Sequence, residues 1–217
     1  MGVVLDYFDC LLRSDDFETL NEGHWINDNI LSFVLEYMRR TVFGEHSNIL
    51  FLDPSVTQLV KLGDYTSVTD LMESLGSSGK SWIFCIVNDS MSTFCEGTHW
   101  SLLVLSPTLG EAYHLDTLQS DANYRSAVKV ATALAAYYQK PDLVYVKHLP
   151  VVVQNNSCDC GIYTIVFLEL ICSHLSTNDL SWRDTGLLSD SLHELAASKR
   201  GALKLLIRGL NLRKHDG

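Results

Sequence analysis

The sequence predicts an α+β domain whose mixed central sheet packs against a buried helix, with a cysteine at the N-terminal end of that helix. Three observations support this prediction. Helical patterns occupy both ends of the 217-residue chain, and apolar runs of strand length lie between them. Two of these runs flank the turn 106–110 and are expected to pair as an antiparallel hairpin. Helices and strands that are segregated along the chain are typical of α+β folds.

The N-terminal half is expected to contain an extended opening followed mainly by helices. Residues 3–12 are apolar and include β-branched side chains, which favours an extended segment. Asn27 or Asp28 is suited to cap a helix that runs to about Arg40 and is closed by Gly44. Further along we expect a strand over 49–52, a helix over 56–62, a helix from Thr66 or Ser67 to Leu75, and a buried strand over 82–87.

The C-terminal half is expected to hold the hairpin and three helices. The hairpin strands are 99–105 and 111–116. The remaining expected elements are an Ala-rich helix over 126–139, a strand over 143–149, a buried helix over 162–175 preceded directly by Cys160 and Gly161, and a last helix over 189–210. No stretch has the composition of a linker, so residues 1–217 are interpreted as a single domain.

Composition and charge exclude several classes of function. A net charge of −10 makes nucleic acid an unfavourable partner and suits a basic one. No apolar run reaches the roughly 20 residues that span a bilayer, so we expect no membrane insertion. The N-terminus lacks the features of a signal peptide, and the six cysteines are therefore expected to be reduced thiols in the cytoplasm and nucleus.

Two further patterns are interpreted as structural. Cys158 and Cys160 have no second Cys pair or Cys/His set at zinc-finger spacing, so we expect neither a metal nor another cofactor. Near the C-terminus, basic residues alternate with apolar ones at helical spacing and are interpreted as the solvated side of an amphipathic helix. They are Lys199, Arg200, Lys204, Arg208, Arg213 and Lys214.

The stretch 154–163 carries the features of a cysteine nucleophile. Cys160 stands where a polar, turn-prone run gives way to the apolar helix, and the unpaired N–H groups and positive dipole end of a helix favour a thiolate there. Gly161 lets the backbone come close to whatever approaches the sulfur. Gln154 supplies an amide donor for the same place. Four of the other cysteines are interpreted as small core residues: Cys10, Cys85, Cys95 and Cys172.

The hairpin selects a base among the eight histidines. A turn centred on Thr108 places His99 opposite Thr117, with Asp116 beside it, in a register uncertain by one residue. A carboxylate in that position orients an imidazole and stabilises its protonated form. His114 is the rival because it shares a strand face with Asp116, but it lies deeper in the strand and farther from a sulfur on a loop. The other six histidines are interpreted as loop, helix-surface or strand residues.

These four residues form a constellation for acyl transfer. Cys160 attacks a carbonyl carbon, His99 gives a proton to the leaving amine, and Asp116 orients His99. Gln154 and the backbone N–H of Cys160 stabilise the tetrahedral oxyanion, to which one such donor typically contributes about 2.7–4 kcal/mol. Water then releases the acyl-enzyme.

Four short motifs are distributed along nearly the whole chain in a specific order and spacing. They are Trp25-Ile26-Asn27-Asp28, Gly97-Thr98-His99-Trp100-Ser101-Leu102-Leu103, Tyr113-His114-Leu115-Asp116, and the run from Gln154 to Asp159-Cys160-Gly161. Together they resemble the motifs of the sentrin-specific (Ulp-type) cysteine proteases, a family with a papain-like fold. The compact length and the opening Val-Val-Leu-Asp-Tyr-Phe-Asp-Cys are most similar to the small deneddylase branch of that family.

The resemblance implies a substrate and a binding site. The substrate would be a Nedd-type ubiquitin-like modifier, cleaved after its C-terminal Gly-Gly in its precursor and in conjugates with lysines of cullins and other proteins. Trp100 would cover the Gly-Gly, the loop from Asn88 to Thr98 would close over it, and Trp25 and Asp28 would contact the tail or body of the modifier. The protein is expected to be a monomer.

The chain departs from the branch at three places. Glu96-Gly97 stands where paired small residues are usual, Thr117 where serine is usual, and Cys158 where an aromatic residue is usual. The first departure leaves the choice of modifier open, so a SUMO-specific protease is the main alternative. An acetyltransferase with the same triad and a catalytically inactive modifier-binding module are the alternatives from other classes.

Overall fold

The computed structural model of the protein describes residues 2–44, 48–92 and 97–215. A five-stranded mixed sheet forms its centre, in the order β3 (Ile49–Leu52), β4 (Trp82–Asn88), β5 (Trp100–Ser106), β6 (Glu111–Leu115) and β7 (Val146–His148). The three middle strands are antiparallel to one another, whereas β3 and β7 lie parallel to their neighbours at the two edges. The predicted α+β fold with a mixed sheet is confirmed.

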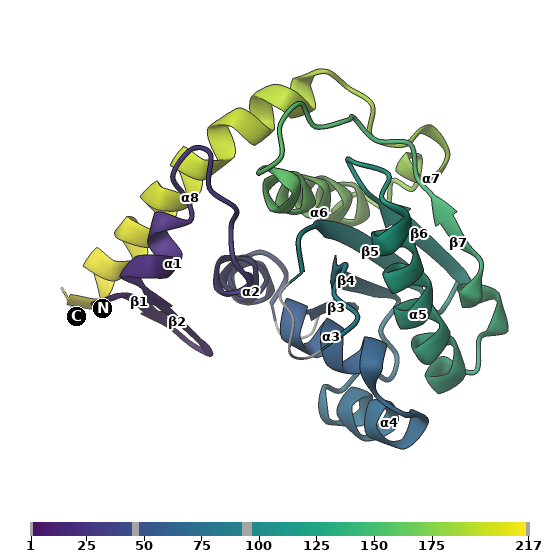
Figure 1. Ribbon diagram of the computed structural model, residues 1–217. Coiled ribbons are helices and arrows are strands. Elements are labelled where there is room, and N and C mark those ends of the chain that lie inside the picture. The colour runs from purple at the N-terminus through teal and green to yellow at the C-terminus, as the bar shows by residue number, and fades with distance from the viewer. Residues whose placement is uncertain (1, 45–47, 93–96, 216–217) are drawn as a thin grey trace.

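Helices cover both faces of the sheet, which explains why its strands read as unbroken apolar runs. On one face, Phe84 and Ile86 pack in the same core cluster as α2 (Asp28–Tyr37), α6 (Cys160–Ser176) and α8 (Ser191–His215). On the other face, the alternate residues Ile83 and Cys85 pack against α3 (Pro54–Leu62), α4 (Tyr65–Ser74) and α5 (Asp121–Tyr138). The nucleophile helix α6 is thus buried against the sheet, as Figure 1 shows.

The N-terminal hairpin packs against the C-terminal helix. The hairpin of β1 (Val3–Tyr7) and β2 (Cys10–Arg13) and the short helix α1 (Ser14–Glu18) lie along the long helix α8 (Figure 1). The C-terminal helix therefore closes the N-terminal segment onto the body of the protein. No helix in the described part of the chain is long and apolar enough to cross a bilayer.

Local chemistry explains where several elements begin. Asn27 caps α2 as expected, because its side chain accepts a hydrogen bond from the Ile30 backbone N–H at 3.1 Å. This helix continues as the π-helical segment η1 (Met38–Phe43) before Gly44, whose φ of 70° ends it.

Some predicted boundaries were wrong. Asp64 caps α4 instead of Thr66 or Ser67, and Ser120 caps α5, which begins five residues before the expected start at 126. The hairpin pairs Leu102 with Leu115, which lies within the one-residue uncertainty of the expected register. The short elements α1, η2 (Pro141–Val144) and α7 (Trp182–Thr185) were not predicted, since segments of four or five residues carry no measurable helical period.

The interpretation of the C-terminal basic residues as a solvated face was also wrong for Arg200. This residue is 7% exposed and lies inside the structure, whereas the apolar Leu205 of the same helix is 71% exposed. Four cysteines were predicted to be core residues. Cys85 and Cys172 are buried in the core as expected, Cys10 is only half-buried, and Cys95 lies outside the described residues.

Candidate active site

His99 and Asp116 form a buried ion pair at one end of the hairpin. His99 directly precedes β5 and Asp116 directly follows β6, and His99 Nε2 lies 2.5 Å from Asp116 Oδ1. The carboxylate is held by two further donors, the backbone N–H groups of Leu118 and Ser120, each at 2.9 Å. Asp116 is thereby fixed as the partner of the imidazole, in the arrangement that the hairpin predicted.

The charges of this pair support each other. Burial by itself raises the pKa of Asp116, but hydrogen bonds from His99 and from two backbone N–H groups, together with the charge of His99, bring it below its usual value. Burial by itself lowers the pKa of His99, yet hydrogen bonds to Asp116 and Cys160 and the charges of both groups raise it to about 9. A protonated imidazole beside the sulfur therefore persists at neutral pH.

Cys160 is the first residue of α6 and contacts His99. Its side chain is 3% exposed. Since Nε2 of His99 faces Asp116, the other ring nitrogen, Nδ1, is the one available to the sulfur. The cysteine thus meets the field of the helix N-terminus and the positive ring together, both of which stabilise a thiolate.

Gly161 is required by the packing around the nucleophile. A Cβ atom at this position would lie 2.6 Å from Cγ1 of Ile26 and 3.2 Å from Cδ1 of Trp100. The Trp100 indole also donates to the Ile26 carbonyl at 3.2 Å. Two motifs far apart in sequence therefore converge on the backbone next to Cys160, where the sequence predicted only that something would approach closely.

Gln154 is buried and its amide group is oriented on both sides. Its Oε1 accepts a hydrogen bond from the Thr117 hydroxyl at 2.5 Å, and its Nε2 donates to the Asn156 carbonyl at 2.6 Å. An amide nitrogen carries two hydrogens, so one remains for an oxyanion. The role of Gln154 as an oxyanion donor stays a prediction, and Thr117 is the residue that fixes its orientation.

His114, the rival base, has a different environment. It is 1% exposed, its Nε2 lies 2.9 Å from the Ser101 hydroxyl, and its ring packs against those of Tyr124 and His148. Burial, together with the charges of nearby histidines, lowers its pKa to about 4 against the opposing effect of Asp116. It is therefore a neutral core histidine, as its depth in the strand indicated. The buried Asn123 side chain links His114 to His99: it donates to the Ser101 hydroxyl, which also contacts His114, at 2.8 Å, and to the His99 carbonyl at 3.3 Å.

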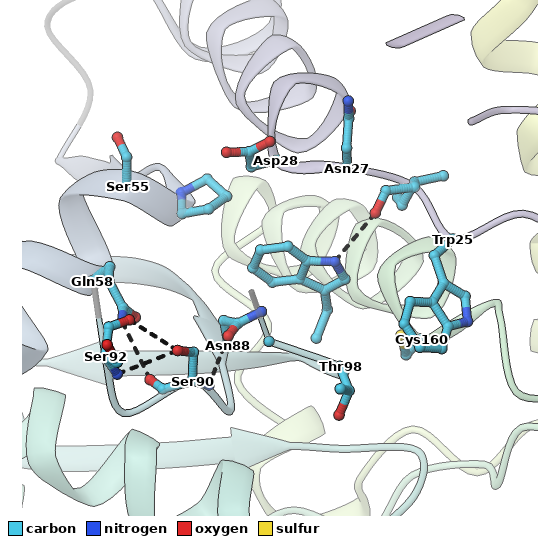
Figure 2. Close-up of a pocket in the computed structure, with 14 residues that line it drawn as sticks. Trp25, Asn27, Asp28, Ser55, Gln58, Asn88, Ser90, Ser92, Thr98 and Cys160 are labelled. Carbon is cyan, nitrogen blue, oxygen red and sulfur yellow. Dashed lines mark hydrogen bonds between the residues drawn. The ribbon is translucent and has the colours of Figure 1, made fainter. Parts of the chain in front are cut away.

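A cleft of about 440 Å³ reaches Cys160 from the side of α2 and α3. All five residues expected to bind substrate line it: Trp25, Asp28, Asn88, Thr98 and Trp100. Figure 2 shows Trp25 and Cys160 at one end of the cleft and Ser55, Gln58 and Ser92 at the other. Trp25 is half exposed and its indole donates to the Ser157 carbonyl at 2.8 Å, which holds it beside the nucleophile loop.

The far wall of the cleft depends on residues that the sequence did not indicate. Lys61 of α3 donates to the carbonyls of Asn88 at 2.7 Å and Ser90 at 2.5 Å, and burial lowers its pKa to about 8. Gln58 donates to the carbonyls of Ser90 and Ser92 at 3.2 and 3.1 Å. The sequence signal for this role of Lys61 was that a lysine stands among the apolar residues of the predicted helix 56–62.

The loop expected to close over the tail is described only in part, because residues 93–96, including Glu96, lie outside the described residues. On its far side, Thr98 donates to Asp89 through both its backbone N–H and its hydroxyl, each at 2.7 Å. A Cβ atom at Gly97 would lie 1.7 Å from Asn88 Oδ1, so any other residue at this position would displace the Asn88 side chain from the cleft wall.

Within the described ranges, no three His, Cys, Asp or Glu side chains gather as ligands for a metal. The arrangement instead holds a sulfur, an imidazolium, an orienting carboxylate and a narrow cleft with polar walls. Such a set can form and break an acyl–sulfur bond at the end of an extended peptide.

The comparison with known protein families agrees with this chemistry. Residues 24–195 match the model of the Ulp1 protease family, C-terminal catalytic domain. The chain belongs to the Ulp1 protease family. The matched segment includes all four predicted catalytic residues and the described residues of the cleft wall.

Individual relatives of this Ulp1-family protease extend the match. The chain is 33% identical to Sentrin-specific protease 8 of Homo sapiens over 211 residues, which covers 96% of this chain and 97% of that protein. It is 26% identical to NEDD8-specific protease 1 of Arabidopsis thaliana, covering 83% and 80% of the two chains. Among solved structures, the C-terminal Ulp1 protease domain in complex with Smt3, the yeast ortholog of SUMO, superimposes with a TM-score of 0.70 at 20% identity, over 97% of this chain and 89% of that one. This last likeness establishes the shared fold.

Proposed function

We propose that this protein is a cysteine isopeptidase that cleaves after the C-terminal Gly-Gly of NEDD8 or a close Nedd-type modifier, from its precursor and from lysine conjugates. The observation that carries the proposal is the contact of Cys160 with the His99–Asp116 pair at the end of a cleft. The choice of modifier is supported by the relatives named for sentrin or NEDD8 that match over most of both chains.

The reaction follows from the protonation state of the pair. The thiolate of Cys160 attacks the carbonyl carbon of the terminal glycine, and the negative charge moves to the carbonyl oxygen. The backbone N–H of Cys160 and the free amide hydrogen of Gln154 are the donors proposed for that oxyanion. As the C–N bond breaks, the His99 imidazolium gives its proton to the leaving lysine amine.

The second half of the reaction regenerates the thiolate. His99, now neutral, takes a proton from a water molecule, whose oxygen attacks the thioester carbon. The C–S bond breaks, the new carboxylic acid of the modifier releases its remaining proton to solvent, and the sulfur returns as a thiolate to its place beside the imidazolium. Asp116 stays ionised throughout, because its pKa lies below its usual value.

The cleft favours a tail that ends in two glycines. Trp100 and Ile26 line the cleft together with Cys160, and glycines, which carry no side chain, are the residues that we expect to fit between them. Asp28, at the start of α2, gives the cleft an acidic side chain for a basic residue in the modifier tail. The net charge of −10 acts in the same direction.

Labelling with electrophilic modifiers tests the proposal. NEDD8 and SUMO that carry a C-terminal vinyl or propargyl group are incubated with the protein, and the covalent adduct is followed as a mass increase. We expect an adduct with NEDD8 that disappears in C160A and persists in C158A, the neighbouring thiol. An adduct with SUMO alone would favour the SUMO-protease alternative.

Two other outcomes would replace the proposal. Tight binding of NEDD8 without adduct formation or hydrolysis of a fluorogenic conjugate would indicate an inactive binding module. Turnover of acetyl-CoA without reaction with either modifier would indicate an acetyltransferase. Each of these results excludes the isopeptidase.

The biological setting is part of the same proposal. We propose cullin–NEDD8 conjugates as substrates, a monomeric protein, and a location in cytoplasm and nucleus. Hydrolysis of a purified cullin conjugate, the molar mass in solution and imaging of a tagged protein measure these three points separately.

A further inference from the structure

Arg200 occupies a position where helix α8 presents its buried side. Ala196 stands four residues before it, Leu203 three residues after it and Ile207 seven residues after it, and all three are buried in the core cluster. Arg200 itself is 7% exposed, although arginine is rarely buried without a specific set of partners. The position calls for an explanation other than packing.

The partners of Arg200 belong to two separate segments. One is Asp159, whose Oδ1 accepts from Nη2 at 2.6 Å and from Nε at 3.1 Å. The other is the N-terminal segment, where Nη1 donates to the carbonyls of Thr19 at 2.9 Å and Asn21 at 3.0 Å, and Nη2 donates to the carbonyl of His24 at 2.7 Å. The planar guanidinium is suited to satisfy several fixed acceptors in this way.

Both segments lead directly into the active site. Asp159 is the residue before Cys160 and the N-cap of α6. His24 precedes Trp25 and Ile26, which line the same cleft as Cys160. Arg200 therefore connects the loop that carries the nucleophile to the segment that brings Trp25 and Ile26 to the cleft.

A second contact joins the same two segments. The Trp25 indole donates to the Ser157 carbonyl at 2.8 Å. Trp25 is half exposed, whereas Arg200 is buried, so the arginine is the contact that solvent does not weaken. Lys199, next to Arg200, has a different target: it pairs with Glu169, nine residues beyond Cys160 on α6.

We propose that Arg200 is a positioning residue for the reaction: through Asp159 it fixes Cys160 opposite His99, and through the carbonyls of residues 19–24 it fixes the Trp25 wall of the cleft. The inference rests on the proposed function for its substrate, but the contacts themselves do not depend on which modifier is cleaved. Its consequence is that one side chain on the C-terminal helix controls both the rate of the chemical step and the binding of the tail.

The test compares R200M and D159A with the control K199M, using a fluorogenic NEDD8 conjugate and active-site concentrations determined by titration. D159A removes the link from Arg200 to the nucleophile loop, together with a hydrogen bond within that loop from Asn156 at 2.8 Å, and leaves the contacts of Arg200 with residues 19–24 in place. We therefore expect kcat to fall about tenfold with KM nearly unchanged, since misplacement of a reacting group of this kind lowers the rate by up to a hundredfold. R200M removes both links, so kcat falls similarly and KM rises about tenfold. D159N keeps one acceptor and should recover part of kcat, and K199M should match the wild type.

The outcomes separate positioning from stability. If R200M and D159A unfold at lower denaturant concentration but keep the kcat and KM of the wild type per active site, the proposal is overturned. If R200M does not fold, D159A decides alone, because a wild-type kcat in that variant would equally overturn it. If the wild type itself leaves the NEDD8 conjugate intact, the proposed function fails. Alkylation of Cys160 by iodoacetamide then tests the positioning role of Arg200 separately. Slower alkylation in R200M and D159A than in K199M supports that role, and equal rates refute it.

Discussion

Replacing Asp116 with asparagine should move the alkaline limit of activity. In the protein, Asp116 and Cys160 oppose the effect of burial and raise the pKa of His99 to about 9 from an ordinary value of 6.5. That difference corresponds to a preference on the order of 3 kcal/mol for the protonated ring. In D116N the amide oxygen still accepts a hydrogen bond from the ring, but the charge is lost and the pKa of His99 falls toward 6.5.

The size of the effect depends on pH. At pH 7.5 a histidine with a pKa near 6.5 is only about one-tenth protonated, so the loss of the proton donor lowers kcat/KM by up to about tenfold. At pH 6 the ring is protonated in both proteins, so the charge effect is small there. In the wild type, the Leu118 and Ser120 N–H groups each donate to a different oxygen of the Asp116 carboxylate. Asparagine has an NH2 group in place of one of these oxygens, so one donor loses its acceptor and the variant is less stable.

The assay is the pH dependence of kcat/KM on a fluorogenic modifier conjugate, from pH 5.5 to 9.5. D121N serves as the control, because it removes one negative charge from an exposed side chain at the start of α5. An alkaline limb that stays near pH 9 in D116N, or a loss of activity that is equal at every pH, would refute the role assigned to Asp116. Denaturant unfolding at each pH separates any loss of folded protein from the effect on the reaction.

Three further substitutions test other parts of the site. In G161A the added Cβ would lie 2.6 Å from Ile26, so we expect a loss of about 1–3 kcal/mol in the free energy of unfolding and a higher KM; unchanged values of both would contradict the packing. T117V removes the donor to Gln154, and kcat should fall with little change in KM, while T117S retains wild-type kcat; equal kcat in T117V would show that the orientation of the amide is unimportant. In the wild type, the free energy of unfolding should decrease between pH 6.5 and 9, because the folded state keeps the proton on His99 whereas the unfolded state has lost it. H99Q should lack this decrease. An identical pH dependence of the unfolding free energy in both proteins would disprove the raised pKa of His99.

The parts of the site that sequence reasoning found share one property. His99 and Asp116 are separated by a single hairpin, so strand pairing alone brings them to the same edge, and the one-residue uncertainty in the register was too small to separate them. Cys160 was indicated by the abrupt start of an apolar helix, which is a local signal. Asn27 was found as a cap because its side chain acts within one turn.

The parts that it did not find depend on contacts between distant segments. Arg200 has the spacing and charge of an ordinary surface residue, and its burial follows from carbonyls more than 170 positions away in the chain. Lys61 was hidden in the same way, since its acceptors lie 27 and 29 residues further on. The α4 cap was misassigned because Asp64, Thr66 and Ser67 are all acceptable caps, and only the path of the chain decides among them.

The separation in sequence between the base and the nucleophile has a consequence for a chain without its C-terminal helix. His99 and Asp116 are only 17 positions apart, so their hairpin is a local structure, whereas the loop that precedes Cys160 is held by Arg200, which also binds the Thr19 carbonyl near the start of the chain. A chain that lacks α8 would therefore keep the contact between His99 and Asp116 but lose the arginine that ties the loop before Cys160 to residues 19–24.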